Sequence, residues 1–81
     1  MPMLEWEKTV NDCLRHEWHL QLEYVDDETD ERCWRTVATV WDNGMWHTWD
    51  EHGTGGANDQ AGTIQAAKAA AAAAAIEQGF I

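Results

Sequence analysis

Alternation of apolar and polar residues predicts three extended segments in the first two-thirds of the chain. Residues 14–25 place leucine, tryptophan and tyrosine side chains on one face and mostly charged or amide side chains on the other. This two-residue repeat is that of a β-strand with one buried and one wetted face. Residues 32–42 are rich in tryptophan, valine and threonine, which favour strands, and residues 45–51 continue the pattern.

An Asn43-Gly44 pair separates the second and third of these segments. Asn-Gly favours a two-residue hairpin turn of type I′, because both central positions of that turn need positive φ. Such a turn sets the register of the hairpin and places Trp41 opposite Trp46. Aromatic pairs at this position stabilise a sheet by about 0.2–1 kcal/mol.

The predicted register also assigns the two faces of the hairpin. Val37, Trp41 and Trp46 share one face, and Trp34 and Ala38 share the other. We assign the Ala38 face to the helix side, although the alternation alone leaves this choice open. Trp41 and Trp46 would then remain partly accessible as partner-binding residues, since tryptophan is a frequent interface anchor. The alternative is that the two indoles only cover each other.

The last third of the chain predicts one loop and one helix. Residues 53–62 are rich in glycine and are expected to form a flexible loop. Thr63 is a suitable N-cap, and residues 64–78 are almost all strong helix formers. Gly79 is expected to end the helix, with Phe80 folding back on its last turn.

Residues 3–13 leave two possibilities open. Their apolar and acidic residues alternate as in a strand, but Trp6, Val10 and Cys13 also fit a helical spacing. We favour the strand. The expected architecture is a single α+β domain over residues 1–81, with a small antiparallel sheet of three or four strands at about 3–52 packed against one C-terminal alanine-rich helix. Its element order is ββββα, with αβββα as the alternative.

The net charge of the chain is the feature that most restricts its possible functions. Fifteen acids stand against five bases in 81 residues, for a net charge of −10. This argues against direct binding to nucleic acid or to an anionic membrane, because both would be repelled, and it predicts a basic protein partner. Small domains typically carry a net charge of about 2–8 in magnitude, so the excess suggests a function. The proposed partner-binding carboxylates are Glu23, Asp26, Asp27, Glu28, Asp30, Glu31, Asp42, Asp50 and Glu51.

The cysteines and the N-terminus predict a cytoplasmic protein. Cys13 and Cys33 are the only two cysteines, whereas small secreted domains usually carry four or more. We expect both to be reduced, semi-buried thiols. The N-terminal residues lack the basic and apolar regions of a secretory signal, and the run Ala69–Ala75 is too weakly apolar to insert into a membrane.

Catalytic and metal-binding motifs are weak. His16 and His19 are three residues apart on a predicted strand, whereas the metalloprotease motif needs a spacing of four on a helix. The chain has no serine, and the glycines at 53–56 lack the Gly-Lys-Ser/Thr of a phosphate loop. We therefore expect no enzymatic activity, no metal and no cofactor.

Residues 34–79 resemble a pattern found in small proteins of bacteriophages and mobile elements. The residues that carry it are Trp34, Val37, Asn43-Gly44-Met45-Trp46, Gly53–Gly56, Thr63-Ile64 and Ala67-Lys68-Ala69-Ala70. The small size, the acidity and the sheet-plus-helix build are also similar in composition to anti-CRISPR and other anti-restriction proteins.

These likenesses imply a phage-encoded anti-defence protein of the host bacterial cytoplasm. Its carboxylates would imitate DNA phosphates and block the DNA-binding surface of a CRISPR–Cas effector complex, and it would act as a monomer or weak homodimer. Two alternatives stay open, a structural or assembly module of a phage particle and a small acidic regulatory protein.

Overall fold

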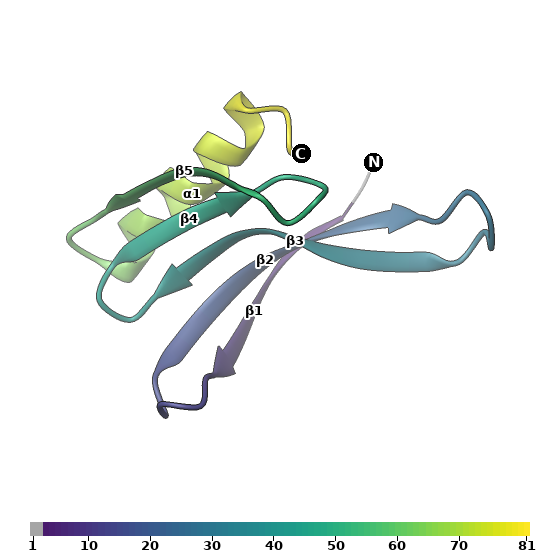
Figure 1. The fold of residues 1–81 in the computed structure, drawn as a ribbon. Coiled ribbons are helices and arrows are strands. Elements are labelled where there is room, and N and C mark those ends of the chain that lie inside the picture. The colour runs from purple at the N-terminus through teal and green to yellow at the C-terminus, as the bar shows by residue number, and fades with distance from the viewer. Residues whose placement is uncertain (1–2) are drawn as a thin grey trace.

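The computed structural model describes residues 3–81. Met1 and Pro2, which the predicted domain over residues 1–81 includes, lie outside the described residues. Its elements are β1 (Leu4–Val10), β2 (His16–Val25), β3 (Arg32–Trp41), β4 (Met45–Trp49), β5 (Gly55–Gln60) and α1 (Ile64–Glu77). Each strand pairs antiparallel with the next, so the sheet order follows the chain (Figure 1). The α+β class is confirmed, and the first segment is a strand rather than a helix.

The fifth strand corrects the expectation of a flexible loop at 53–62. Residues 55–60 pair with β4 and form an edge of the sheet. Gly55 and Gly56 are needed here because β5 runs very close to the side chains of β4. A Cβ on Gly55 would collide with the imidazole of His47, and one on Gly56 would meet the Thr48 hydroxyl. These glycines therefore allow close approach rather than flexibility.

The β3–β4 hairpin differs from its predicted register by one residue. Val40, not Trp41, faces Trp46. The Gly44 N–H donates to the Trp41 carbonyl at 3.0 Å, and Gly44 has a φ of +84° while Asn43 keeps a negative φ. This is a three-residue connection that ends in a left-handed glycine, not a type I′ turn. The shift turns every β4 side chain to the opposite face.

A β-bulge in β3 also reverses the face on which some of its side chains lie. Leu20 pairs with Ala38 and Gln21 pairs with Thr36, so Val37 is an extra residue on β3. The alternation of β3 is therefore inverted before the bulge. As a result Trp34 lies on the face opposite to Ala38, which corrects the prediction that the two share a face.

Helix α1 covers one face of the sheet, over β3, β4 and β5. We call this the helix face and the other the open face. The prediction that the helix covers the Ala38 side is confirmed. Alanine lets the helix approach the sheet closely, since its side chain is a single methyl. The buried apolar residues are Leu20, Leu22, Val37, Ala38, Val40, Trp46, Ala67, Ala71 and Ala75.

Both ends of α1 are capped as predicted. The Thr63 hydroxyl accepts a hydrogen bond from the Ala66 N–H at 3.1 Å. At the other end Gly79 has a φ of +78°, and the Phe80 N–H donates to the Ala75 carbonyl at 2.8 Å, as in a Schellman motif. In the part of the chain that the structure describes, no helix has the length and hydropathy needed to cross a membrane.

Candidate functional site

The hairpin between β2 and β3 extends beyond the rest of the sheet. Among residues 3–81, residues 23–34 pair only with each other, apart from one hydrogen bond from the Glu23 N–H to the Met3 carbonyl. We call this segment the acidic arm; it points away from α1 on the right of Figure 1. Its turn carries the acids Asp26, Asp27, Glu28, Asp30 and Glu31. Most of the predicted partner-binding acids are therefore gathered at one extremity.

The turn of the arm is ordered by its own acids. The Asp26 N–H donates to the Glu31 carbonyl at 2.9 Å, and the Asp26 carboxylate accepts from the Glu28 N–H at 2.9 Å. Asp30 has a φ of +58°, a conformation that aspartate tolerates better than most residues. Asp26 thus holds the turn in shape, while Asp27, Glu28, Asp30 and Glu31 are exposed.

Apolar side chains are exposed on the strands of the arm. Tyr24 is 42% exposed, Val25 51% and Trp34 44%. Coulombic repulsion from Cys33, directly opposite Tyr24, raises the pKa of the Tyr24 hydroxyl above its ordinary value. An acidic tip above exposed aromatic side chains combines long-range attraction for a basic partner with contact area.

The other predicted site residues, apart from Trp41, lie in three separate places. Asp50 and Glu51 lie in the β4–β5 loop, at the same end of the sheet as the arm. Asp42 lies at the opposite end and pairs with Arg15 at 3.0 Å, which raises the pKa of that guanidinium. Trp46 is buried in the core at 8% exposure and is not a surface anchor.

Trp41 therefore lies on the open face without Trp46. Its indole N–H donates to Glu17 at 3.1 Å. Glu17 also accepts from Asn11 at 3.1 Å and lies 3.1 Å from His19 Nε2. These hydrogen bonds, led by that of Asn11, lower the pKa of Glu17 despite its partial burial. The predicted apolar patch of two indoles is replaced by one indole fixed to a carboxylate.

The network continues across β3 to β4. His19 Nδ1 lies 3.5 Å from the Thr39 hydroxyl, which accepts from the Trp49 indole N–H at 3.0 Å. Carboxylate, imidazole and hydroxyl thus occur in the order of a catalytic triad. Thr39 is only 4% exposed, however, and its hydroxyl already accepts from Trp49. The arrangement links β2, β3 and β4 across the open face.

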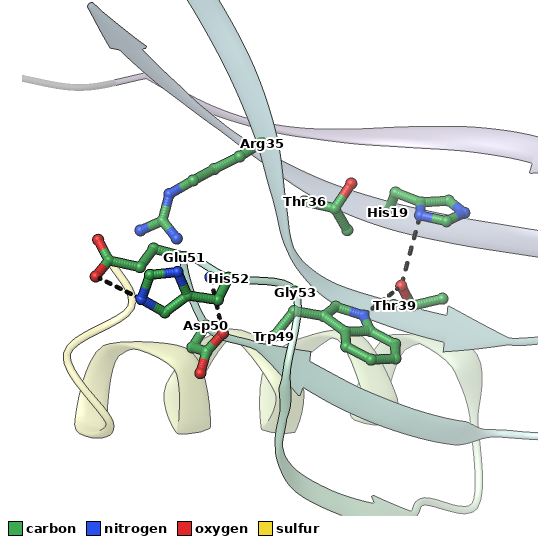
Figure 2. Close-up of a pocket in the computed structure, with 9 residues that line it drawn as sticks. All are labelled: His19, Arg35, Thr36, Thr39, Trp49, Asp50, Glu51, His52 and Gly53. Carbon is green, nitrogen blue, oxygen red and sulfur yellow. Dashed lines mark hydrogen bonds and ion pairs between the residues drawn. The ribbon is translucent and has the colours of Figure 1, made fainter. Parts of the chain in front are cut away.

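A hollow of about 580 Å³ lies beside this network (Figure 2). Arg35 borders it and donates from Nη2 to the Phe80 carbonyl at 2.7 Å. Its Nη1 is buried without a hydrogen-bond partner among residues 3–81. The charged lining residues of the hollow are Arg35 and the acids Asp50 and Glu51. The lining residues are His19, Arg35, Thr36, Thr39, Trp49, Asp50, Glu51, His52 and Gly53.

A second hollow of about 560 Å³ lies near the base of the arm and has a different character. Glu5, Glu7 and Gln21 share the open face with Trp34, because the bulge in β3 turns Trp34 toward them. Alternation in residues 3–10 already places the two glutamates on one face. The position of Trp34 depends on the bulge, for which the sequence carries no clear signal.

Comparison with protein-family models, curated proteins and solved structures finds no match to this chain.

The structure also shows where the cysteines and two of the histidines lie. Cys13 and Cys33 are free thiols, but Cys13 is exposed rather than semi-buried, because it lies in the β1–β2 turn. His16 and His19 lie on opposite faces of β2, as strand alternation predicts. Within residues 3–81, no three histidine, cysteine or acidic side chains converge as metal ligands.

Proposed function

We propose that this chain is a small inhibitory binding protein whose acidic arm occupies a lysine- and arginine-lined surface that normally holds nucleic acid. The target class we favour is a CRISPR–Cas effector complex, which places the protein in the cytoplasm of a bacterial host. The observation that carries the proposal is the arm itself, with four exposed carboxylates on an ordered turn and exposed apolar side chains behind them.

The energetics favour cumulative action of the arm. Each exposed ion pair is worth only about 0–1 kcal/mol. Several carboxylates held together raise the association rate with a basic surface, and this effect weakens with salt. Because the Asp26 side chain fixes the turn, the charges are presented in one arrangement and less conformational entropy is lost on binding.

The test compares two variants of equal charge. The arm variant carries Asp27→Asn, Glu28→Gln and Glu31→Gln and keeps Asp26. The control carries Asp12→Asn, Asp59→Asn and Glu77→Gln, all exposed and outside the arm. Three carboxylates become amides in each, so both change the net charge from −10 to −7.

The measurement is competition with target DNA for purified Cas effector complexes at low and moderate salt. We expect the parent and the control to displace DNA, and the arm variant to need about tenfold more protein. Equal inhibition by the two variants would exclude the arm as the inhibitory surface. Absence of competition by the parent would exclude a nucleic-acid-binding site on these complexes as the target.

A further inference from the structure

The hollow at the base of the acidic arm brings carboxylates and an indole together on the open face. Glu5 pairs with Gln21, Glu7 follows two residues later on the same face, and Trp34 comes from β3. The whole lining consists of Glu5, Trp6, Glu7, Lys8, Gln21 and Trp34, around about 560 Å³. Two carboxylates therefore border a space that also has an aromatic wall.

The lining of this hollow contains one basic residue, Lys8, which forms no ion pair with either glutamate within residues 3–81. Among residues 3–81, no basic side chain lies within ion-pair distance of Glu5 or Glu7. The ammonium of Lys8 is directed to the helix face, where it lies 5.7 Å from the centre of the Trp18 ring. Both glutamates thus keep their full capacity to accept hydrogen bonds from a bound cation.

The helix face of the same sheet shows how this chain pairs indoles with cations. The ammonium of Lys68 lies 5.6 Å from the Trp6 ring centre and 5.4 Å from that of Trp18. Such contacts are attractive because the π-face of indole is negative. Trp34 has no cation over its ring within the described part of the chain, yet its side chain is 44% exposed.

We propose that this hollow receives an arginine side chain of a basic protein partner. A guanidinium is planar, so it can lie against the Trp34 indole while its edges donate to carboxylates. Alternate residues of a strand are about 6.8 Å apart, so Glu5 and Glu7 present two acceptors along one line. Lysine offers a single compact charge and fits this combination less well.

This inference rests on the proposed function, since it assumes the same basic partner and gives it a second point of attachment. The acidic tip provides long-range attraction, whereas the hollow at the base provides a specific anchor. Anchors of this kind, where an aromatic residue meets arginine, are common centres of binding energy in interfaces.

The test uses three capped tripeptides, Gly-Arg-Gly and its lysine and citrulline counterparts, titrated into ¹⁵N-labelled protein. Citrulline keeps the shape of arginine without its charge. The Trp34 indole N–H resonance is assigned by its loss in Trp34→Phe. We expect arginine to shift this resonance in a saturable way, lysine to bind about threefold or more weakly, and citrulline to leave the resonance in place.

Variants locate the site. Glu5→Gln with Glu7→Gln should weaken arginine binding at least about fivefold, because charge-assisted hydrogen bonds are replaced by neutral ones. Glu28→Gln with Glu31→Gln removes the same charge from the arm tip and should leave the Trp34 titration within about twofold. Equal shifts with citrulline, or equal loss in both variants, would overturn the proposal.

The proposed function and the arginine site can be refuted independently of each other. If the arm variant loses DNA competition while the Trp34 resonance ignores arginine, the hollow is not an anchor and the proposed function stands. If arginine binds the hollow as expected but the parent protein does not compete with DNA, the proposed function fails and the arginine site stands. Thermal melts of the glutamine variants, which should match the parent, exclude unfolding as the cause of lost binding.

Discussion

Trp34 and Trp46 lie on the neighbouring strands β3 and β4 but in different environments. Trp46 lies on the helix face and Trp34 on the open face. Trp46 is 8% exposed and packs in the core with Val40 and the alanines of α1. Trp34 is 44% exposed and borders a hollow lined by carboxylates. A helix of this kind covers only one face of a sheet. On the other face, aromatic side chains either remain accessible to solvent or are held by hydrogen bonds.

The largest expected effect on stability comes from replacing each of these tryptophans separately with alanine. Trp46→Ala should lower the free energy of unfolding by about 3–5 kcal/mol, because it empties a buried site. In a domain of this size, that is a fall in the thermal midpoint of more than about 12 °C. Trp34→Ala should cost about 1 kcal/mol or less. Similar losses in calorimetry for both variants would contradict the assignment of faces.

A smaller effect should distinguish the two sides of α1. Ala71 is fully buried against the sheet and Ala73 is exposed. Ala71→Leu should push the helix off β3 and β4 and cost about 1–3 kcal/mol, whereas Ala73→Leu should change stability by about 0.5 kcal/mol or less. Denaturant unfolding of both variants measures the difference. Equal stability would show that the helix does not need to lie this close to the sheet.

The loops on either side of β4 each contain a glycine with a left-handed backbone, and the two offer a matched pair. Gly44 and Gly53 both have positive φ, +84° and +75°. A Cβ on Gly44 would also collide with the Ala61 carbonyl, while nothing lies within 4 Å of one on Gly53. Each Gly→Ala change should cost about 1–2 kcal/mol for the left-handed backbone, and Gly44→Ala should cost more. A smaller loss at Gly44 in thermal melts would contradict the three-residue connection.

Much of the fold was predictable because most elements carry their own local signal. Alternation identifies β1 to β4, and alanine content with Thr63 and Gly79 identifies α1 and its ends. β5 carries no such signal, since its glycines are required by contacts with His47 and Thr48 on the neighbouring strand. Faces were less predictable than strands, because one residue in a turn or one extra Val37 reverses them.

The candidate site was predictable to a similar extent. The acidic turn is evident from composition, since like charges without apolar residues form a solvated connection. The hollow at Trp34 is assembled from β1, β2 and β3 and depends on the bulge. Trp46 was placed on the wrong face because of the turn, and Trp34 because of the bulge. Local charge is visible in a sequence, while the meeting of distant side chains depends on register.

The smallest expected effect concerns the network that fixes the open face. Hydrogen bonds from Asn11, His19 and Trp41 lower the pKa of Glu17 from its ordinary value of 4.5. A lowered pKa in the folded state means that the ionised carboxylate stabilises the fold above about pH 4.5. This contribution is lost as the pH falls through the lower, folded-state pKa.

Replacing Glu17 with glutamine should therefore matter mainly at neutral pH. Glu17→Gln offers one acceptor oxygen to several donors, so its free energy of unfolding should be below that of the parent at pH 7. The gap should narrow as the pH falls below 4.5, because the parent then loses its charged acceptor. Glu7→Gln removes an equal charge from an acid with no ion pair among residues 3–81 and should show no such narrowing. Denaturant unfolding from pH 7 to pH 3 gives the comparison, and a gap for Glu17→Gln that stays constant across this range would show that the network does not stabilise the open face through its carboxylate.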